Sequence, residues 1–364
     1  MQTDPPLSVR CVPMVLLHVL LACLLVLSSA AASQPLAPLD LRDVDDAYAR
    51  WLDKHPPPTE PHPQDAYHLV EELHGELGVW VQRRPHMVRP FMAGRTIDER
   101  PIWGYRVADP GHPITHRVLV FGGIHALEWI ASEVVLGFTQ EFIQQPVPGV
   151  ELVVIPVLNV DGRRKAEEDL LAGENTFRRG NGHRVDLNRD FAVHHESTSI
   201  WRHILPGYHS ASPAPLSQPE SQAIDRLAGL GHYDLAVSLH SFGGFLYLPW
   251  SGHWARPDDW PALRELGYAM AAGQGAYAYR VLQLSRWGFF FRAQGSELDH
   301  LYGAHGIPAV LVECSRTGLS PFRPGEWSSY FVRYNPADPS RHVREVSGAL
   351  RAGVLHVADG PTER

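Results

Sequence analysis

The chain has 364 residues, of which 44% are apolar and 20% charged, a balance typical of a globular protein and not of a disordered one. Its formal net charge is −8 and it has no run of lysines or arginines, so we expect no nucleic-acid partner. With 21 histidines in the chain, a metal site is worth searching for.

The first 32 residues have the features of a secretory signal sequence. Arg10 precedes an apolar stretch at 11–27, and the small residues at 30–32 fit a cleavage site before Ser33. Two other interpretations stay open: an uncleaved membrane anchor, and a bacterial lipoprotein signal around Cys23. We therefore expect a secreted or periplasmic protein, with no stable membrane span after signal cleavage.

Proline and charged residues dominate the next segment, 33–64, in which we expect a short helix at 41–51 followed by a stiff linker. Beyond it we find neither a repeat nor an internal boundary, so residues 65–364 are expected to form one domain.

Within that domain, short apolar runs typical of buried strands alternate with helical spacing of apolar residues. The expected strands are 102–107, 117–121, 151–157, 235–239 and 309–312. The expected helices are 66–81, 128–144, one that begins with a capping box at Ser217, 260–271 and 340–357. This alternation predicts a single α/β domain, with a mixed, mostly parallel sheet and helices on both faces.

Cysteine usage is sparse. Cys11 and Cys23 lie in the predicted signal, which leaves Cys314 alone in the mature chain, without a partner for an internal disulfide. Cys314 follows an apolar run, where a buried and inert thiol is expected.

Polar residues with metal-binding chemistry follow three of the predicted strands. His125 and Glu128 lie three residues apart at a strand-to-helix corner, His240 follows the run 235–239, and Glu313 follows the run 309–312. Strand ends are where α/β proteins place their sites. Each residue alone has an ordinary structural explanation, but two histidines and a glutamate, with water in the fourth position, form a catalytic zinc site.

The motifs around these residues resemble those of the zinc carboxypeptidase family, typified by pancreatic carboxypeptidase A, over roughly residues 65–356. The matches follow the order of the family. His125–Ile130 matches His-x-x-Glu-Trp-Ile, 159–162 matches Asn-Pro-Asp-Gly with Val160 in place of proline, and 177–179 matches Trp-Arg-Lys. Residues 186–190 match Asp-x-Asn-Arg-Asn with Asp190 in the last place, 239–241 match Leu-His-Ser, and Glu313 matches the catalytic glutamate. Six separate matches make the resemblance specific.

The resemblance implies a carboxypeptidase-like fold and a secreted metallocarboxypeptidase that needs one zinc ion per chain. His125, Glu128 and His240 would hold the zinc, which would activate a water molecule. Glu313 would be the general base, and Arg178 would stabilise the oxyanion of the transition state.

Further residues would bind the substrate, a peptide with a free C-terminal carboxylate. Asn188 and Arg189 would bind that carboxylate, and Asp186 would orient His125 from behind. The neighbouring Arg179 is expected to be an ordinary surface residue.

Several positions depart from the family pattern. Phe291 falls where the family has a mobile tyrosine, with Tyr302 nearby, and Leu298 falls where enzymes specific for basic residues carry aspartate. Leu298 favours apolar or neutral terminal residues, whereas Arg286 and Arg292 could favour acidic ones.

Leu127 replaces a family arginine, and the segment before Asp65 is too short for the long inhibitory pro-domain of digestive relatives. We expect a monomer. Two alternative functions stay open: a zinc amidase acting on cell-wall peptides, and a zinc-binding homologue without activity.

Overall fold

The computed structural model describes residues 35–41, 44–196, 212–288, 291–316 and 328–360. The predicted signal at 1–32 lies outside the described residues. The chain divides into two compact units at Leu36, and the unit Leu36–Arg364 contains all the helices and strands discussed below.

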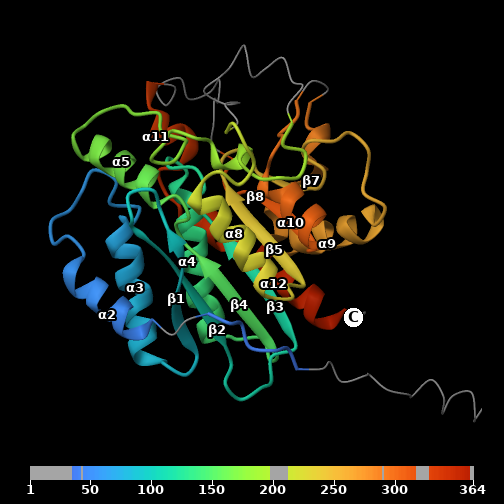
Figure 1. Cartoon of the computed structure of the whole chain (residues 1–364), viewed down its shortest axis with the longest axis horizontal. Helices are drawn as coiled ribbons and strands as arrows, with labels where there is room; N and C mark the ends of the chain where they lie inside the picture. Colours follow the sequence, from blue (N-terminus) through green and yellow to red (C-terminus); the bar gives the residue numbers. More distant parts are fainter. Residues whose placement is uncertain (1–34, 42–43, 197–211, 289–290, 317–327, 361–364) are drawn as a thin grey trace, which may run out of the picture. The chain divides into compact units, whose positions relative to one another are not determined.

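An eight-stranded mixed sheet, with strand order β1-β2-β4-β3-β5-β8-β6-β7, forms the centre of this unit (Figure 1). The strands are β1 (Val88–Arg95), β2 (Pro101–Ala108), β3 (His116–Phe121), β4 (Val150–Ile155), β5 (Leu235–His240), β6 (Phe245–Leu248), β7 (Arg280–Gln283) and β8 (Ala309–Glu313). The central strands β4, β3, β5 and β8 run parallel to one another, while β1, β2 and β6 join by antiparallel pairing. The central runs are apolar throughout because helices cover both of their faces.

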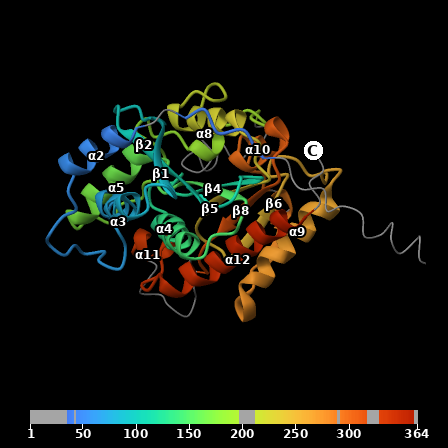
Figure 2. The same cartoon turned by 90° about the horizontal axis from the view of Figure 1, so that it is seen from below.

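Helices lie on both faces of the sheet (Figure 2). The α-helices are α2 (Asp45–Lys54), α3 (Val70–Arg83), α4 (Trp129–Gln144), α5 (Val160–Leu171), α8 (Pro219–Leu230), α9 (Trp260–Gly273), α10 (Glu297–His305), α11 (Tyr330–Tyr334) and α12 (Ser340–Asp359). Short 3₁₀ turns occur at Leu187–Arg189, Gly275–Tyr277 and Leu284–Arg286. Helices α4, α12 and α9 pack together on one face, and α8 and α10 pack together on the other. The predicted α/β class, with a mixed sheet covered on both faces, is confirmed.

All five predicted strands and all five predicted helices of the domain occur, with ends shifted by a few residues. The strands β1, β6 and β7 and the helices α5, α10 and α11 were not expected from the sequence. The predicted capping box at Ser217 is wrong: helix α8 starts at Pro219, with Gln218 as its N-cap. Ser217 instead donates its hydroxyl to Asp190 over 2.7 Å, so its side chain is not available to the helix.

The proline-rich segment 33–64 contributes described residues to the core of this unit. Leu39 and Tyr48 are buried, and the Tyr48 hydroxyl is hydrogen-bonded to the Tyr105 hydroxyl of β2 at 2.8 Å. Helix α2 begins at Asp45, later than the expected 41–51, and packs against α3 and β1. Packing of this unit therefore begins before Asp65.

Cys314 is buried directly after β8, as expected. Burial raises the pKa of its thiol well above the ordinary value, which favours the unreactive neutral form. None of the helices described is both long enough and apolar enough to cross a membrane.

Candidate metal centre

Three potential metal ligands meet where the central strands end. His125 lies shortly after β3, Glu128 is the residue before α4, and His240 ends β5. All three are buried, with at most 3% of any of them exposed. Because β3 and β5 are neighbouring parallel strands, their carboxyl ends meet at one edge of the sheet, and the ligand atoms lie within 4.8 Å of one another.

The turn between β3 and α4 brings the first two ligands together. Gly123 in this turn has a φ of +65°, a left-handed conformation that glycine adopts without strain. A β-carbon there would lie 3.0 Å from the Cα of Val157, so the chain also passes too close for a larger residue. Asn159, at the N-terminus of α5, donates its amide to the Ile124 carbonyl over 3.2 Å and holds the turn from the next strand end.

The three ligand groups point toward a common centre. Glu128 Oε1 lies 2.9 Å from His125 Nδ1, and Glu128 Oε2 lies 3.2 Å from His240 Nδ1. The two Nδ1 atoms are 3.1 Å apart. Neighbouring ligand atoms of a tetrahedral zinc site are separated by about 3.3 Å, since zinc–ligand bonds are about 2.0 Å long. Two imidazole lone pairs cannot bond to each other, so a shared cation fits this donor set.

Each imidazole is oriented by a second carboxylate on its far side. His125 Nε2 is hydrogen-bonded to Asp186 Oδ1 at 3.1 Å, and His240 Nε2 to Glu297 Oε1 at 2.8 Å. The same Glu297 oxygen accepts the Ser238 hydroxyl at 2.9 Å. A proton held on Nε2 leaves the lone pair on Nδ1, the atom that faces the centre. Proteins commonly set the tautomer and orientation of metal-binding histidines in this way.

Negative charge around the two imidazoles favours a cation. Burial alone would lower the pKa of His240, but the carboxylates of Glu297 and Glu128 outweigh it and raise this pKa to about 10. Burial would also oppose ionisation of Asp186, but neighbouring cations, Arg179 first, keep the pKa of its carboxyl well below the usual value. Positive charge is therefore stabilised at this point, and a metal ion would compete with the proton.

Replacing Glu297 should weaken metal binding without unfolding the chain. Glu297→Ala removes the acceptor that orients His240, and loss of such a partner costs roughly 10–100-fold in metal affinity. Glu297→Gln keeps an acceptor oxygen and should lose less. The affinity is measured by competition with a zinc chelator of known strength.

Glu220→Gln is the matched control for this experiment. Glu220 is a buried carboxylate on α8 that accepts from Asn181 at 3.1 Å, and burial raises its pKa to about 7, so a neutral amide suits its position. Its replacement should leave the metal affinity unchanged. Equal affinities in wild type and Glu297→Ala would show that His240 is fixed by other contacts.

Glu313 ends β8 beside the ligands. β5 and β8 pair in parallel with His240 opposite Glu313, and the Cys314 N–H donates to the His240 carbonyl at 2.7 Å. The Oε2 atom of Glu313 is buried, and none of the described residues hydrogen-bonds to it. Burial, and next the charge of Glu128, raise the pKa of Glu313 to about 8. A carboxylate with such an oxygen is suited to accepting a proton.

The adjacent residues Arg178 and Arg179 have different partners. Arg178, a third of whose side chain is exposed, forms a two-pronged pair with Asp169 through Nε at 2.5 Å and Nη2 at 3.1 Å. Arg179 donates from Nε to Asp186 Oδ2 at 2.7 Å, and its Nη1 lies 3.5 Å from Glu128 Oε1. Arg179 therefore adjoins the ligands and Arg178 pairs with Asp169, and the role expected of Arg178 stays a prediction.

The 3₁₀ turn Leu187–Arg189 leaves polar atoms of Asn188 and Arg189 unused. Asp186 caps the turn, because its Oδ1 accepts the Asn188 N–H at 3.0 Å. Asn188 Oδ1 and Arg189 Nε are buried, and neither has a hydrogen-bond partner in the described part of the chain. Burial lowers the pKa of Arg189, and its Nη1 donates to the Asn188 carbonyl. Buried groups of this kind are costly to leave unpaired, so an anionic ligand fits here.

The two expected pocket residues contribute apolar side chains. Leu298 is buried in the first turn of α10, and the Phe291 ring packs against Trp287 with centroids 5.3 Å apart. The Tyr302 hydroxyl donates to Asp259 and is engaged there. A role for Phe291 and Leu298 in substrate binding thus rests on their positions in the chain.

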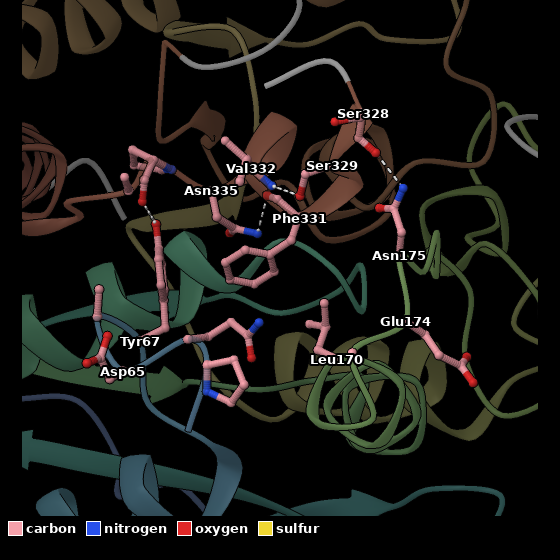
Figure 3. Close-up of a pocket in the computed structure, with 16 residues that line it drawn as sticks. Asp65, Tyr67, Leu170, Glu174, Asn175, Ser328, Ser329, Phe331, Val332 and Asn335 are labelled. Carbon is pink, nitrogen blue, oxygen red and sulfur yellow. Dashed lines mark hydrogen bonds between the residues drawn. The ribbon is translucent and has the colours of Figure 1, made fainter. Parts of the chain in front are cut away.

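Two cavities adjoin this part of the molecule. One, of about 620 Å³, is strongly basic; its lining residues are Gly162, Lys165, 177–182 and Arg184. One of these lining residues, Arg179, also lies beside the metal ligand Glu128. The other, of about 680 Å³, lies between the end of α5, residues 63–67 and residues 328–337, with Phe331 in the middle of the view (Figure 3). None of the three metal ligands lines the second cavity.

Arg179 and Glu297 are the site residues that the sequence did not reveal. The position of Glu297 in the chain was a usable signal for its role, because it comes just after Ser296, a helix N-cap. A helix that starts near the carboxyl ends of strands directs its first residues toward the site.

Comparisons with known proteins agree with this geometry. A family model described as zinc carboxypeptidase matches residues 76–333. Carboxypeptidase B2 of Rattus norvegicus is 25% identical over 214 residues, which are 54% of this chain and 50% of that protein. Carboxypeptidase O of Bos taurus is 24% identical over 265 residues, 68% of this chain and 67% of that protein. The chain spans about half the length of the first of these relatives.

The fold has close counterparts among solved structures. Carboxypeptidase A from Helicoverpa armigera superposes with a TM-score of 0.68 and 18% sequence identity, covering 87% of this chain and 81% of that one. This likeness confirms the carboxypeptidase-like fold that the motifs predict.

Proposed function

Since the chain belongs to the zinc carboxypeptidase family, we propose that it hydrolyses the C-terminal peptide bond of peptides with one catalytic zinc ion. One observation carries the proposal. The ligand atoms of His125, Glu128 and His240 converge in a buried site, beside the Oε2 atom of Glu313, which has no hydrogen-bond partner among the described residues.

His125 Nδ1, His240 Nδ1 and the Glu128 carboxylate would hold the zinc, and Asp186 and Glu297 would keep both imidazoles in the binding tautomer. When bound, zinc lowers the pKa of a coordinated water and polarises the scissile carbonyl.

Glu313 would move the proton. Its free Oε2 would accept a proton from the attacking water and then deliver it to the nitrogen of the leaving amine. The pairing of Glu313 with His240 across β5 and β8 keeps this carboxylate next to the ligands throughout.

Arg189 and Asn188 would recognise the substrate's terminal carboxylate. The guanidinium offers parallel N–H donors that match a carboxylate, and its buried Nε is without a partner among the described residues. Phe291 and Leu298 would line the pocket for the terminal side chain.

Stabilisation of the developing oxyanion requires a cation close to the ligands. Arg179 satisfies this condition, because its Nη1 is 3.5 Å from Glu128. Arg178, which the motif comparison favoured, could serve only after leaving Asp169.

We also infer that residues 1–32 direct export and that the mature chain acts as a monomer. Sequencing the N-terminus of the exported protein tests cleavage before Ser33, and size-exclusion chromatography tests the monomer.

Removing the zinc should abolish peptide hydrolysis. A strong chelator should stop cleavage of blocked dipeptides, and added zinc should restore it, because the three converging ligands are suited to hold this ion. His240→Ala should weaken zinc binding at this site by more than the roughly 10–100-fold expected for loss of an outer partner. Exposed His86 gives the control, since His86→Ala should change neither property. Zinc-free protein that hydrolyses peptides at the normal rate would contradict the proposal.

A further inference from the structure

A second cluster of metal-binding side chains lies between α8 and α10. Asp225 belongs to α8, and His300 and His305 belong to α10. This cluster has no residue in common with the candidate zinc ligands His125, Glu128 and His240. We propose that this cluster is a second metal site, which binds a divalent transition-metal ion independently of the catalytic site and of the proposed hydrolysis.

The geometry of the cluster parallels that of the first site. His300 Nε2 lies 2.8 Å and His305 Nε2 lies 2.9 Å from the same atom, Asp225 Oδ1. The two imidazole rings are 5.1 Å apart and nearly perpendicular, compared with 4.8 Å for the two histidines of the first site. Opening these contacts by a few tenths of an ångström gives the spacing of about 3.3 Å that tetrahedral ligands require.

The donor set of the cluster suits a transition-metal ion. Two imidazoles and one carboxylate favour zinc, cobalt or copper over calcium or magnesium, which prefer oxygen ligands. A metal ion would replace the hydrogen bonds that both Nε2 atoms make with Asp225 Oδ1.

An ion can reach the cluster from solvent. The side chain of Asp225 is 33% exposed and that of His305 is 17% exposed, whereas His300 is 3% exposed and forms the inner wall. Water could therefore fill the fourth position. The His300 Nδ1 atom is buried with no partner among the described residues, so His300 lacks an orienting carboxylate of the kind that both histidines of the first site have. We expect this second site to bind metal more weakly for that reason.

The helices present these ligands rigidly. Ser296 caps the start of α10, and Gly306, with a φ of +66°, ends it by donating its N–H to the Tyr302 carbonyl at 3.0 Å. A metal ion bound at the cluster would join α8 to α10.

Cobalt titration of the tag-free, full-length apoprotein tests the proposal, because visible absorption distinguishes bound Co²⁺ and an affinity tag would add histidines. We expect two Co²⁺ per wild-type chain, with one site weaker. The His240→Ala variant should still bind one Co²⁺ at the α8–α10 cluster, with an affinity that the titration detects.

Variants of the cluster separate the two sites. His305→Gln and Asp225→Asn should each weaken the second Co²⁺ at least tenfold and leave the first unchanged. His232→Gln, an exposed histidine just beyond α8, is the matched control and should alter neither. Circular dichroism establishes that each variant is folded. Two results would overturn the proposal. One is a single Co²⁺ in wild type with none in His240→Ala, and the other is a second ion that His305→Gln and Asp225→Asn do not affect.

Discussion

Glu313→Gln should remove nearly all peptide hydrolysis while the protein keeps its zinc and its fold. Glutamine preserves the shape of the side chain at the end of β8 but cannot accept a proton from water. Positioned general bases contribute on the order of 10²–10⁴-fold, so we expect kcat to fall by that factor. The zinc content, measured on the same sample, should equal that of wild type because Glu313 is not a ligand in this arrangement.

A control is available on α12. Glu345 is a buried carboxylate that pairs with Arg341 at 2.6 Å, and Glu345→Gln should leave kcat unchanged. If Glu313→Gln hydrolysed peptides at nearly the wild-type rate, another group would have to be the base, and the assignment of Glu313 would be wrong.

A peptide with a free C-terminus should be cleaved far faster than the same peptide with a C-terminal amide. The amide carries no negative charge, so it would leave the buried Arg189 guanidinium without its partner. Loss of a charge-assisted hydrogen bond costs about 3 kcal/mol, or roughly a hundredfold in kcat/KM. Arg189→Met should slow cleavage of the acid and bring the two peptides to similar rates.

Arg184 provides the matched control, because it is an exposed arginine in the same region of the chain. Arg184→Met should preserve the preference for the acid. Equal cleavage of acid and amide by the wild-type protein would rule out carboxylate recognition by Arg189. The amidase acting on cell-wall peptides would then be the better candidate, and muropeptides would be the substrates to test.

The central strands could be predicted because they are buried on both faces. β3, β4, β5 and β8 consist of continuous apolar runs, and the structure places their ends within two residues of the prediction. β1 was missed because Pro90 and an irregular register near Gly94 interrupt its pattern. β6 and β7 were missed because each has only four residues and their burial is mixed.

The metal ligands could be predicted for a related reason: His240 ends such a strand, and His125 and Glu128 lie in the turn that leads from another to its helix. Two contacts depend instead on how distant segments pack. Glu297 reaches His240 across 57 positions of sequence. The choice between Arg178 and Arg179 depends on the path of the loop that holds them, which local sequence does not specify.

The parallel register that sets His240 opposite Glu313 has a consequence for engineering. The spacing between base and metal ligand is determined by main-chain hydrogen bonds between two central strands, about 4.8 Å apart in any sheet, and not by the loops around the site. Loop grafts that retain the turn after β3 should therefore change which peptides are accepted without disturbing the reacting pair. This makes the molecule a suitable scaffold for altering peptide preference by exchanging surface segments.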